Sequence, residues 1–168
     1  MTELAPVSTL ISRMADDLRA LLAAREIHDP AMIGIHSGGA WVARELHSRL
    51  GLQTPLGTLD IAFYRDDVGT RGVHPQVRPS NLPFAVDDRD ILLVDDVLYS
   101  GRTVRAAMNE IFDFGRPRQV LLAVLVDRGE RELPVAADVV GTRITLADGQ
   151  RVKLRGPDPM ELTIQDMA

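Results

Sequence analysis

An α/β fold built around a mostly parallel sheet is predicted by three features of this sequence of 168 residues. Short apolar runs of strand length alternate along the chain with amphipathic segments of helix length. Two of the runs, ILLV and QVLLAVLV, are continuous and rich in branched residues, as is typical of strands buried on both faces. The hydrophobic content of 45% is ample for a core, and no linker or repeat is visible. We therefore expect one domain over residues 1–168, with helices on both faces of the sheet.

The first elements are expected to be a helix and a strand. Leucine, isoleucine and methionine recur at three- and four-residue spacing over residues 8–24, which predicts an amphipathic helix. Ser8 or Thr9 is available as its N-cap. A short apolar run at residues 32–35 then predicts the first strand of the sheet.

A turn, a second helix and a second strand follow. Gly38 and Gly39 favour a tight turn after the first strand, and the next helix is expected to end near Leu50. Gly51 is suited to the C-cap of that helix, because glycine readily adopts the left-handed conformation found there. The alternation of apolar residues over residues 59–63 predicts a strand.

The middle of the chain combines a long irregular stretch with a buried strand and a helix. Residues 66–89 carry charges, glycines and prolines with little periodicity, which predicts an active-site lid or a disordered segment. The apolar run at residues 91–94 predicts a buried strand. A helix is expected over about residues 103–114, closed by Gly115 and Pro117.

The C-terminal part is expected to hold another buried strand, at residues 119–126, and a hairpin. Asp148 and Gly149 stand between alternating flanks, a pattern that favours a type I′ turn joining two antiparallel strands. Taken together, strands that alternate with helices along the chain imply a mostly parallel sheet covered on both faces.

Composition excludes several classes of protein. The chain has no cysteine, which excludes disulfide frameworks and thiolate metal sites, and its net charge of -5 argues against a broad nucleic-acid-binding surface. Lys153 is the only lysine and lacks the glycine spacing of a Walker-type phosphate loop. No two histidines have ligand spacing with an acid, so no metal site is predicted from side chains alone. Neither a membrane span nor a secretory leader is visible, so we expect a cytoplasmic protein with no membrane partner.

Two adjacent acids, Asp95 and Asp96, stand where the run at residues 91–94 ends. If the strand continues, at most one of them points into the core; if it has ended, both can turn to a polyol. The next residues supply backbone N–H groups, hydroxyls and a permissive glycine at the start of a helix, which suits an anion. Together these features suit a ribose 5-phosphate. An acid pair in this place is also typical of a helix cap, a solvated loop or the acidic pocket of a response regulator.

Three loops are expected to meet at one edge of the sheet. Ligands of parallel α/β sheets bind beyond the carboxyl ends of the strands. The loops at residues 36–39, 95–103 and 127–129 each follow a predicted strand. The sequence therefore predicts one site composed of all three loops, although Gly38 and Gly39 taken alone indicate no more than a tight turn.

The segments that compose this site resemble a known family. An apolar run, two acids and a Ser-Gly-x-Thr turn in ILLVDDVLYSGRT are similar to the signature with which type I phosphoribosyltransferases bind phosphoribosyl pyrophosphate (PRPP). The resemblance is closer still to the PyrR family, pyrimidine operon attenuators that also act as uracil phosphoribosyltransferases. It is carried, in order, by IGIHSGG, LDIAFYRDD, ILLVDDVLYSGRTVRAAM and FGRPRQVLLAVLVDRGERELPVAADVVG. The resemblance covers residues 8–144, and the C-terminal tail is similar only loosely.

This resemblance implies a type I phosphoribosyltransferase fold and a role for each loop. The fold would include a long flexible catalytic loop and a small hood built partly from residues 127–168. Catalysis is assigned to Asp95, Asp96 and Arg65, and the two acids would bind the ribose hydroxyls. The other assigned residues are the 5-phosphate loop (Tyr99, Ser100, Gly101, Arg102, Thr103), the pyrophosphate loop (His36, Ser37, Gly38, Gly39), the flexible loop (Tyr64, Arg65, Asp66, Asp67) and the uracil contacts (Asp127, Arg128, Val140, Gly141).

The implied reaction is the attack of uracil on the anomeric carbon of PRPP as diphosphate leaves, which gives UMP. Mg²⁺ is implied as a cofactor bound mainly through PRPP oxygens and water. The resemblance also implies a homo-oligomer, a dimer or larger, and a pyrimidine-operon mRNA leader as a partner. RNA-binding PyrR members carry a Thr-Arg pair in the first loop, where this chain has Ser37 and Gly38, which weakens the expectation of RNA contact.

Other interpretations stay open beside this one. The same site would serve a regulator that binds RNA or a protein and uses UMP or PRPP only as an effector, with vestigial catalysis. The hood could accept a purine or another base instead of uracil. Among single residues, Arg65 could be an ordinary surface arginine, and Asp127 could cap a turn with Arg128 as its partner. Trp41 is expected to be a packing residue.

Overall fold

A five-stranded sheet, parallel in every pairing, forms the centre of the computed structural model, which describes residues 3–61 and 80–167. The spatial order of its strands is β2-β1-β3-β4-β5. Their bounds are β1 Ala31–Ile35, β2 Gly57–Leu59, β3 Asp90–Leu98, β4 Gln119–Asp127 and β5 Val139–Arg143. The predicted α/β fold class with a mostly parallel sheet is therefore confirmed.

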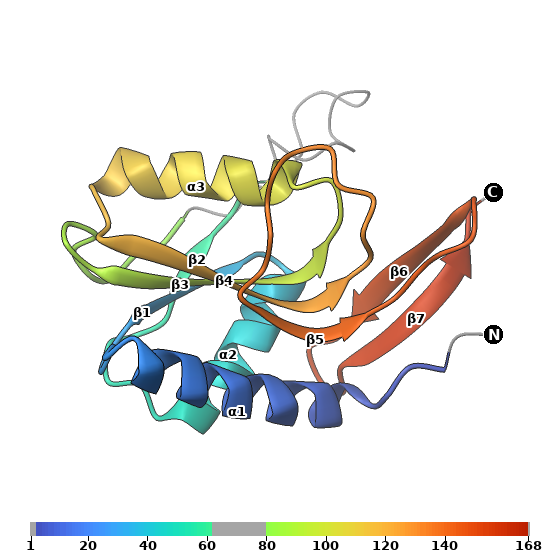
Figure 1. Cartoon of the computed structure of the whole chain (residues 1–168), viewed down its shortest axis with the longest axis horizontal. Helices are drawn as coiled ribbons and strands as arrows, with labels where there is room; N and C mark the ends of the chain where they lie inside the picture. The colour runs from blue at the N-terminus through green and yellow to red at the C-terminus, as the bar shows by residue number, and fades with distance from the viewer. Residues whose placement is uncertain (1–2, 62–79, 168) are drawn as a thin grey trace.

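Helices cover both faces of the sheet (Figure 1). Helices α1 (Val7–Ala24) and α2 (Gly38–Leu50) lie on one face, and α3 (Arg102–Phe114) lies on the other. Each face has its own cluster of buried apolar side chains, because successive strand residues point to opposite faces. Among the described residues, no helix is long and apolar enough to cross a membrane.

Most predicted boundaries agree with the structure, and those of α1, β2 and β3 differ. Gly51 closes α2 in the left-handed conformation, as expected. Helix α1 begins at Val7, and the backbone oxygen of Pro6 accepts its first bonds, so neither Ser8 nor Thr9 is the N-cap. Burial of Val7 draws the first turn into the core, which local capping preference does not foresee.

Strand β2 also departs from its prediction. It covers Gly57–Leu59, whereas alternation favoured residues 59–63. Leu59 and Ile61 are buried as the alternation predicted, but only the first of them pairs with β1. The remainder of that predicted strand, from residue 62, lies outside the described residues.

The predicted hairpin around Asp148 and Gly149 is wrong. A tight turn does occur there, closed by the N–H of Gln150 donating to the carbonyl oxygen of Ala147 at 3.0 Å. The strand before it, β5, pairs in parallel with β4, and the strand after it, β6 (Gln150–Arg155), pairs antiparallel with β7 (Glu161–Asp166). Strand β5 thus forms one edge of the parallel sheet, and the partner of β6 is β7, which comes later in the chain. We call the β6-β7 unit the hood; it projects beyond one end of the sheet (Figure 1).

An ion pair joins the starts of β3 and β4, at the end of the sheet opposite the hood. The guanidinium of Arg118 donates to both carboxylate oxygens of Asp90, and Gln119 Nε2 donates to Asp90 Oδ1 at 2.8 Å. The hydrogen bond from Arg118 holds the pKa of the Asp90 carboxyl below its ordinary value, although burial opposes this shift. The pair is therefore ionised at neutral pH and ties the two central strands together.

Replacing Asp90 with asparagine is expected to lower the free energy of unfolding by about 1–2 kcal/mol, because charge-assisted hydrogen bonds are lost to a partner that stays partly hydrated. Since folding lowers the pKa of Asp90, its stabilising effect is present above about pH 4 and is lost as the pH falls through the folded-state value. Urea denaturation over a pH series measures the effect. The exposed Asp113→Asn serves as control, and a difference between Asp90→Asn and wild type that does not shrink in acid would contradict this account.

Candidate functional site

Strand β3 continues through the two acids to Leu98, so the strand does not end at Val94. Asp95 is 3% exposed and Asp96 is half-buried. Asp95 Oδ1 accepts the N–H of Asp96, and Asp96 Oδ1 accepts the N–H of Val97, each at 2.8 Å. Both acids line the same cavity although the strand continues. The strand therefore does not have to end before both acids can reach a ligand.

The two glycines of the first loop allow the N-terminus of α2 to touch the end of β3. A Cβ at Gly38 would lie 2.3 Å from Asp96 Oδ2, and one at Gly39 would lie 2.8 Å from the carbonyl oxygen of Val94. Real side chains do not tolerate such distances. Glycine at both positions therefore brings the first turn of α2, with its N–H groups, next to the acid pair.

The loop at residues 99–103 turns the chain from β3 into α3. Gly101 has φ of 96°, in the left-handed region that glycine adopts without strain, and it is the N-cap of α3. The Oγ of the buried Ser100 accepts the N–H of Arg102 at 3.2 Å, while Tyr99 is 44% exposed. The predicted anion-binding loop thus has the expected backbone shape at a helix N-terminus.

The third loop differs from its prediction in the partner of Asp127. Both carboxylate oxygens accept from Nη2 of Arg131, at 3.0 and 2.9 Å, and Oδ1 also accepts the N–H of Gly129. Burial raises the pKa of Asp127, but these hydrogen bonds outweigh it and hold the pKa below its ordinary value. Asp127 does cap a turn, with Arg131 and not Arg128 as its cation.

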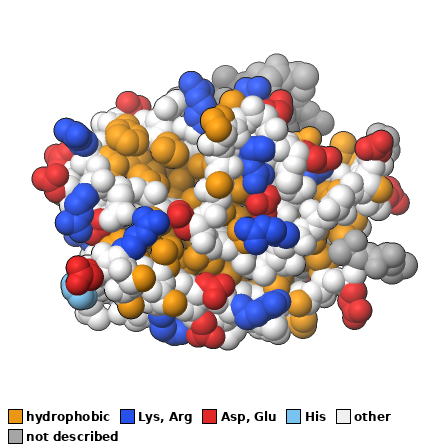
Figure 2. All heavy atoms as spheres, viewed as in Figure 1, with side chains coloured by type: hydrophobic (Ala, Val, Ile, Leu, Met, Phe, Trp, Pro, Cys, Tyr) orange, Lys and Arg blue, Asp and Glu red, His pale blue; other side chains and the backbone are white. Residues whose placement is uncertain are grey.

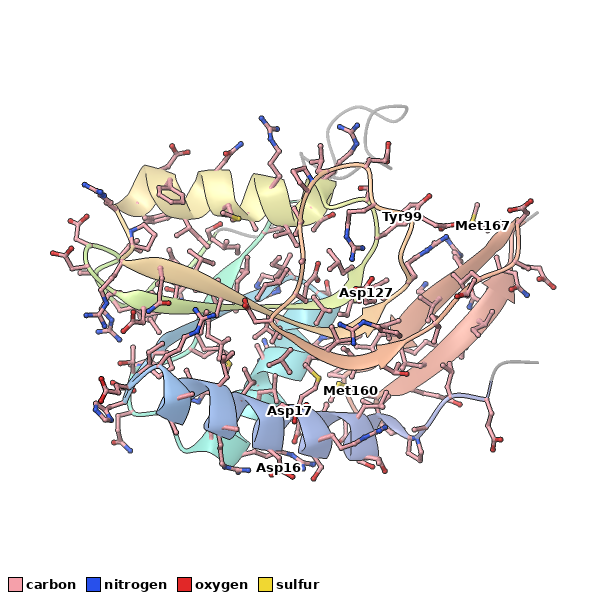
Figure 3. The ribbon with its side chains drawn as sticks, viewed as in Figure 1. Asp16, Asp17, Tyr99, Asp127, Met160 and Met167 are labelled. Atoms are coloured by element: carbon pink, nitrogen blue, oxygen red, sulfur yellow. The ribbon has the colours of Figure 1, made fainter. Side chains whose placement is uncertain are left out.

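Arg128 instead faces Tyr99 and Glu130. Its guanidinium lies 3.9 Å from the centroid of the Tyr99 ring, and its Nη2 donates to Glu130 at 2.7 Å. Its Nε is buried and has no hydrogen-bond partner among the described residues. Because a buried donor without an acceptor is costly, this N–H is the group that a ligand oxygen would satisfy. Tyr99 and Asp127 lie at the end of the sheet beside the hood (Figure 3).

One cavity of about 480 Å³ unites the end of β3, the start of α2, the 99–103 loop and the hood. Seven predicted site residues line it: Ser37, Gly38, Asp95, Asp96, Tyr99, Thr103 and Arg128. A hollow of about 50 Å³ shares Asp95, Tyr99 and Thr103 with the cavity and adds Ser100 and Gly101 to its lining. The convergence of loops predicted from the sequence is therefore confirmed in its geometry.

Some predicted residues stand elsewhere. Val140 and Gly141 lie on β5 and line neither hollow; a Cβ at Gly141 would meet the carbonyl oxygen of Leu125 and the sulfur of Met14, under α1. Their contact with a base stays a prediction. Tyr64, Arg65, Asp66 and Asp67, assigned to the flexible loop, lie outside the described residues. His36, Gly39, Arg102 and Asp127 flank the cavity without lining it.

The hood contributes residues that the sequence reasoning missed. Arg151 and Lys153 line the cavity from β6, together with Trp41 of α2. Alternation along β6 buries Val152 and Leu154 and leaves the two cations on the other face. That alternation was visible in the sequence. Because β6 was predicted to pair with the preceding strand and not with β7, its place beside the site was not recognised. Trp41 packs against the hood turn at Gly156, in keeping with its predicted packing role.

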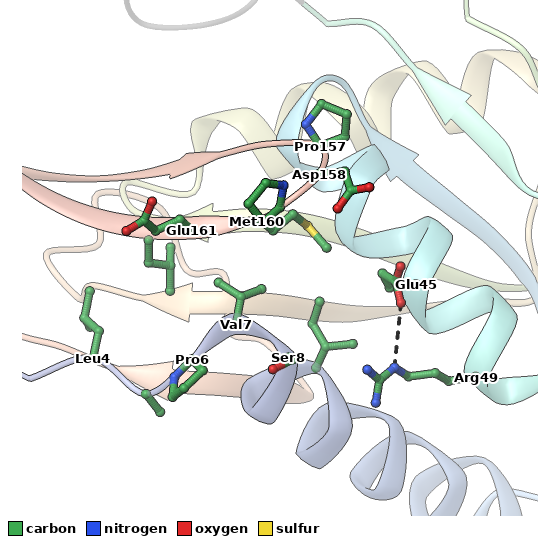
Figure 4. Close-up of a pocket in the computed structure, with 14 residues that line it drawn as sticks. Leu4, Pro6, Val7, Ser8, Glu45, Arg49, Pro157, Asp158, Met160 and Glu161 are labelled. Atoms are coloured by element: carbon green, nitrogen blue, oxygen red, sulfur yellow. Dashed lines mark ion pairs between the residues drawn. The ribbon is translucent and has the colours of Figure 1, made fainter.

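A larger cavity, of about 700 Å³, lies between the start of α1, helix α2 and the hood turn (Figure 4). Its lining includes the ion pair of Glu45 and Arg49, whose charges are directed at each other. None of the predicted site residues lines it. We therefore assign the functional site to the smaller cavity. Among the described residues no cluster of three or more histidines and acids could hold a metal ion by itself.

Comparison with known proteins identifies the family of the chain. The sequence matches the phosphoribosyl transferase domain family over residues 7–153. It is 57% identical over 159 residues to the Bifunctional protein PyrR of Pseudomonas entomophila (strain L48), across 95% of this chain and 92% of that protein.

Two solved structures share the fold. The purine phosphoribosyltransferase of Pyrococcus horikoshii superposes with a TM-score of 0.61 at 27% identity, covering 81% of this chain and 83% of that chain. A hypoxanthine phosphoribosyltransferase of Staphylococcus aureus superposes with a TM-score of 0.66 at 20% identity, covering 86% and 78% respectively. The fold class predicted from the sequence is thus that of type I phosphoribosyltransferases.

Replacing Gly38 with alanine is expected to destabilise the protein by about 1–3 kcal/mol, because the new Cβ collides with the Asp96 carboxylate. In an Asp96→Ala background only the Asp96 Cβ remains, 3.2 Å away, so the cost should fall. A double-mutant cycle from urea denaturation measures this coupling. Gly39→Ala is the matched control: its collision is with the backbone of β3, so its cost should be equal in both backgrounds. Additive effects of Gly38→Ala and Asp96→Ala would disprove the contact.

Proposed function

This chain belongs to the phosphoribosyl transferase family, among its PyrR proteins, and from that premise we propose that it transfers the phosphoribosyl group of PRPP to uracil, giving UMP and diphosphate. The observation that carries the proposal is the cavity of about 480 Å³ with walls of different chemistry. Carboxylates suit vicinal hydroxyls, helix N-termini suit phosphates, and cationic side chains suit carbonyl and phosphate oxygens. PRPP and uracil together present all of these groups.

In this proposal the ribose lies against the end of β3. Asp96 lines the cavity and Asp95 lines both the cavity and the adjoining hollow. Their carboxylates would accept hydrogen bonds from the two ring hydroxyls. The 5-phosphate would lie at the start of α3, with the loop from Tyr99 to Thr103 around it, and the diphosphate would approach Gly38 at the start of α2, where the absence of a side chain leaves the N–H groups accessible.

The base would lie between Arg128 and the hood. The unsatisfied Nε–H of Arg128 supports this placement, because a uracil carbonyl oxygen can accept it. Arg151 and Lys153, on the facing hood strand, are donors only. These donors, which stand beside the apolar side chains of Val152 and Leu154 in the lining, favour a base with carbonyl oxygens over one with an exocyclic amine at the same position.

Chemically, a bond forms from N1 of uracil to the anomeric carbon as the bond from that carbon to diphosphate breaks, and the N1 proton is released. No protein nucleophile is required. The protein contributes by orienting the two reactants and by donating hydrogen bonds to oxygens on which negative charge develops. We also propose that Arg65, with Tyr64, Asp66 and Asp67, acts on the diphosphate, as the family resemblance implies.

The acids at the end of β3 fit Mg²⁺ carried by the substrate. Mg²⁺ retains water and takes one or two protein carboxylates beside substrate phosphate oxygens, so it suits a site in which the described residues form no cage of three protein acids. When bound, the ion would neutralise charge on the leaving diphosphate. The homo-oligomeric state, the cytoplasmic location and the single-domain organisation of the chain stay predictions.

Steady-state release of diphosphate from PRPP and Mg²⁺ tests the transferase. With uracil we expect turnover of about 1 per second or faster, with UMP as product, and much slower turnover with hypoxanthine, guanine or orotate. Asp96→Asn should lower kcat/KM for PRPP by roughly tenfold or more, because a charge-assisted acceptor is lost. The exposed Asp113→Asn should leave it unchanged. Turnover with a purine but not uracil would reassign the base, and no turnover beside measurable UMP binding would make the site a sensor with vestigial catalysis.

A second function is favoured by one observation: the PyrR relative is named bifunctional. We propose that the same UMP- or PRPP-binding site controls a pyrimidine-regulatory role. Lys, Arg, Asp and Glu side chains are interspersed on the face shown in Figure 2, which offers RNA no broad basic surface there. On that face, RNA contact would thus be confined to a local patch.

A gel shift with the pyrimidine-operon leader of the source organism tests the RNA role. Specific RNA binding is expected to strengthen with UMP and to weaken steeply with salt, because phosphate contacts release counterions. An unrelated RNA of equal length is the control. Absence of salt-sensitive, leader-specific binding would leave a protein partner as the route of regulation.

A further inference from the structure

A second loop, residues 127–135, supports the 99–103 loop without itself lining the hollow beside it. The backbone N–H groups of Glu132 and Leu133 both donate to the carbonyl oxygen of Ser100 at 2.9 Å. A Cβ at Gly101 would lie 3.2 Å from Val135 Cγ2 and 3.3 Å from Leu133 Cβ. The conformation of the 99–103 loop therefore depends on its contacts with the 127–135 loop.

Arg131 joins the two loops through every part of its guanidinium. Its Nε donates to the carbonyl oxygen of Val135 and its Nη1 to that of Tyr99, each at 2.8 Å. Its Nη2 holds both oxygens of Asp127 at the end of β4. The side chain is 23% exposed, so this network is partly shielded from water.

We propose that Arg131 is a positioning residue for the 5-phosphate subsite: by holding the Tyr99 carbonyl and the 127–135 loop to the end of β4, it keeps the N–H groups at the start of α3 in phosphate-binding geometry. This inference rests on the proposed function, since it presupposes that a 5-phosphate binds at residues 99–103. It concerns a residue that touches no part of the ligand site, because Arg131 lines neither the cavity nor the hollow.

The charge of Arg131 supports an indirect role. Its guanidinium is already paired with Asp127, and its donors are directed at protein oxygens, so it does not act as a phosphate ligand itself. Lysine could not replace it, because one ammonium cannot hold the Asp127 carboxylate and two separated carbonyls at once. Two further contacts between the loops, Arg102 with Glu132 at 3.5 Å and Arg128 over the Tyr99 ring, remain without it. Loss of Arg131 is therefore expected to loosen the loop and not to unfold it.

The test compares the affinities for UMP and uridine, which differ only in the 5-phosphate. Isothermal titration with wild type, Arg131→Gln and Arg131→Lys gives the ratio of the two affinities for each protein. We expect wild type to prefer UMP, and both variants to lose roughly tenfold or more of that preference while uridine affinity changes little. KM for PRPP should rise by a similar factor, with a smaller change in kcat.

Arg118→Gln is the matched control, because Arg118 holds Asp90 in a bidentate pair at the other end of the same two strands. It should lower the melting temperature without changing the UMP to uridine ratio. An unchanged ratio in the folded Arg131→Lys protein overturns the inference but leaves the proposed transferase intact. A wild type that does not prefer UMP over uridine overturns both. Should Arg131→Gln fail to fold, the result for Arg131→Lys decides alone. An equal loss of affinity for UMP and for uridine would overturn the inference, because it would assign Arg131 a general structural role only.

Discussion

The parallel register of β1, β3 and β4 is the constraint on which the site depends. Gly34 stands opposite Val94, and Val94 stands opposite Ala123, so the three strands run toward the same edge in step. Strands β3 and β4 then continue together to Leu98 and Asp127, after β1 has ended at Ile35. Because β1 is shorter, the start of α2 lies beside the acids at the end of β3. Strands β3 and β4 end together, so the loops that follow them begin at the same level of the sheet. The unequal lengths of these strands thus help to form the cavity at the end of the sheet.

Close packing between the start of α2 and the end of β3 places groups of different chemistry side by side. Gly38 and Gly39 bring the start of α2 against Asp96 and the backbone of β3, so donors and carboxylates are neighbours in space although they are more than fifty residues apart in sequence. Any side chain at these two positions would separate them. The same requirement recurs at Gly101, where Leu133 and Val135 leave little space and φ is positive. Backbone proximity, and not a specialised side chain, is what makes the two helix N-termini available to anions.

Sequence reasoning succeeded where the signal is local and failed where it depends on pairing. The runs ILLV and QVLLAVLV identified β3 and β4, and the turn at residues 100–103 identified the start of α3, because each pattern is contained within a few residues. Where Asp127 was considered as the cap of a turn, Arg128 was named as its partner because it is adjacent in sequence, but the turn at Gly129 directs Arg131 to the carboxylate. The hood was misread because β5 and β6 are adjacent in sequence, whereas β5 pairs with β4 and β6 pairs with β7.

The distribution of charge in the cavity explains how an acidic chain can bind a polyanionic substrate. Asp95 and Asp96 lie on the sheet side, whereas Arg128, Arg151 and Lys153 lie on the loop and hood side. A polyphosphate near the acids alone would be repelled, and a cavity of cations alone would offer the ribose hydroxyls no acceptors. Two walls of opposite sign favour a ligand whose own groups are arranged in the same order. Arg151 and Lys153 are exposed, so salt screens their attraction for an anionic ligand more strongly than it screens contacts with the buried Asp95.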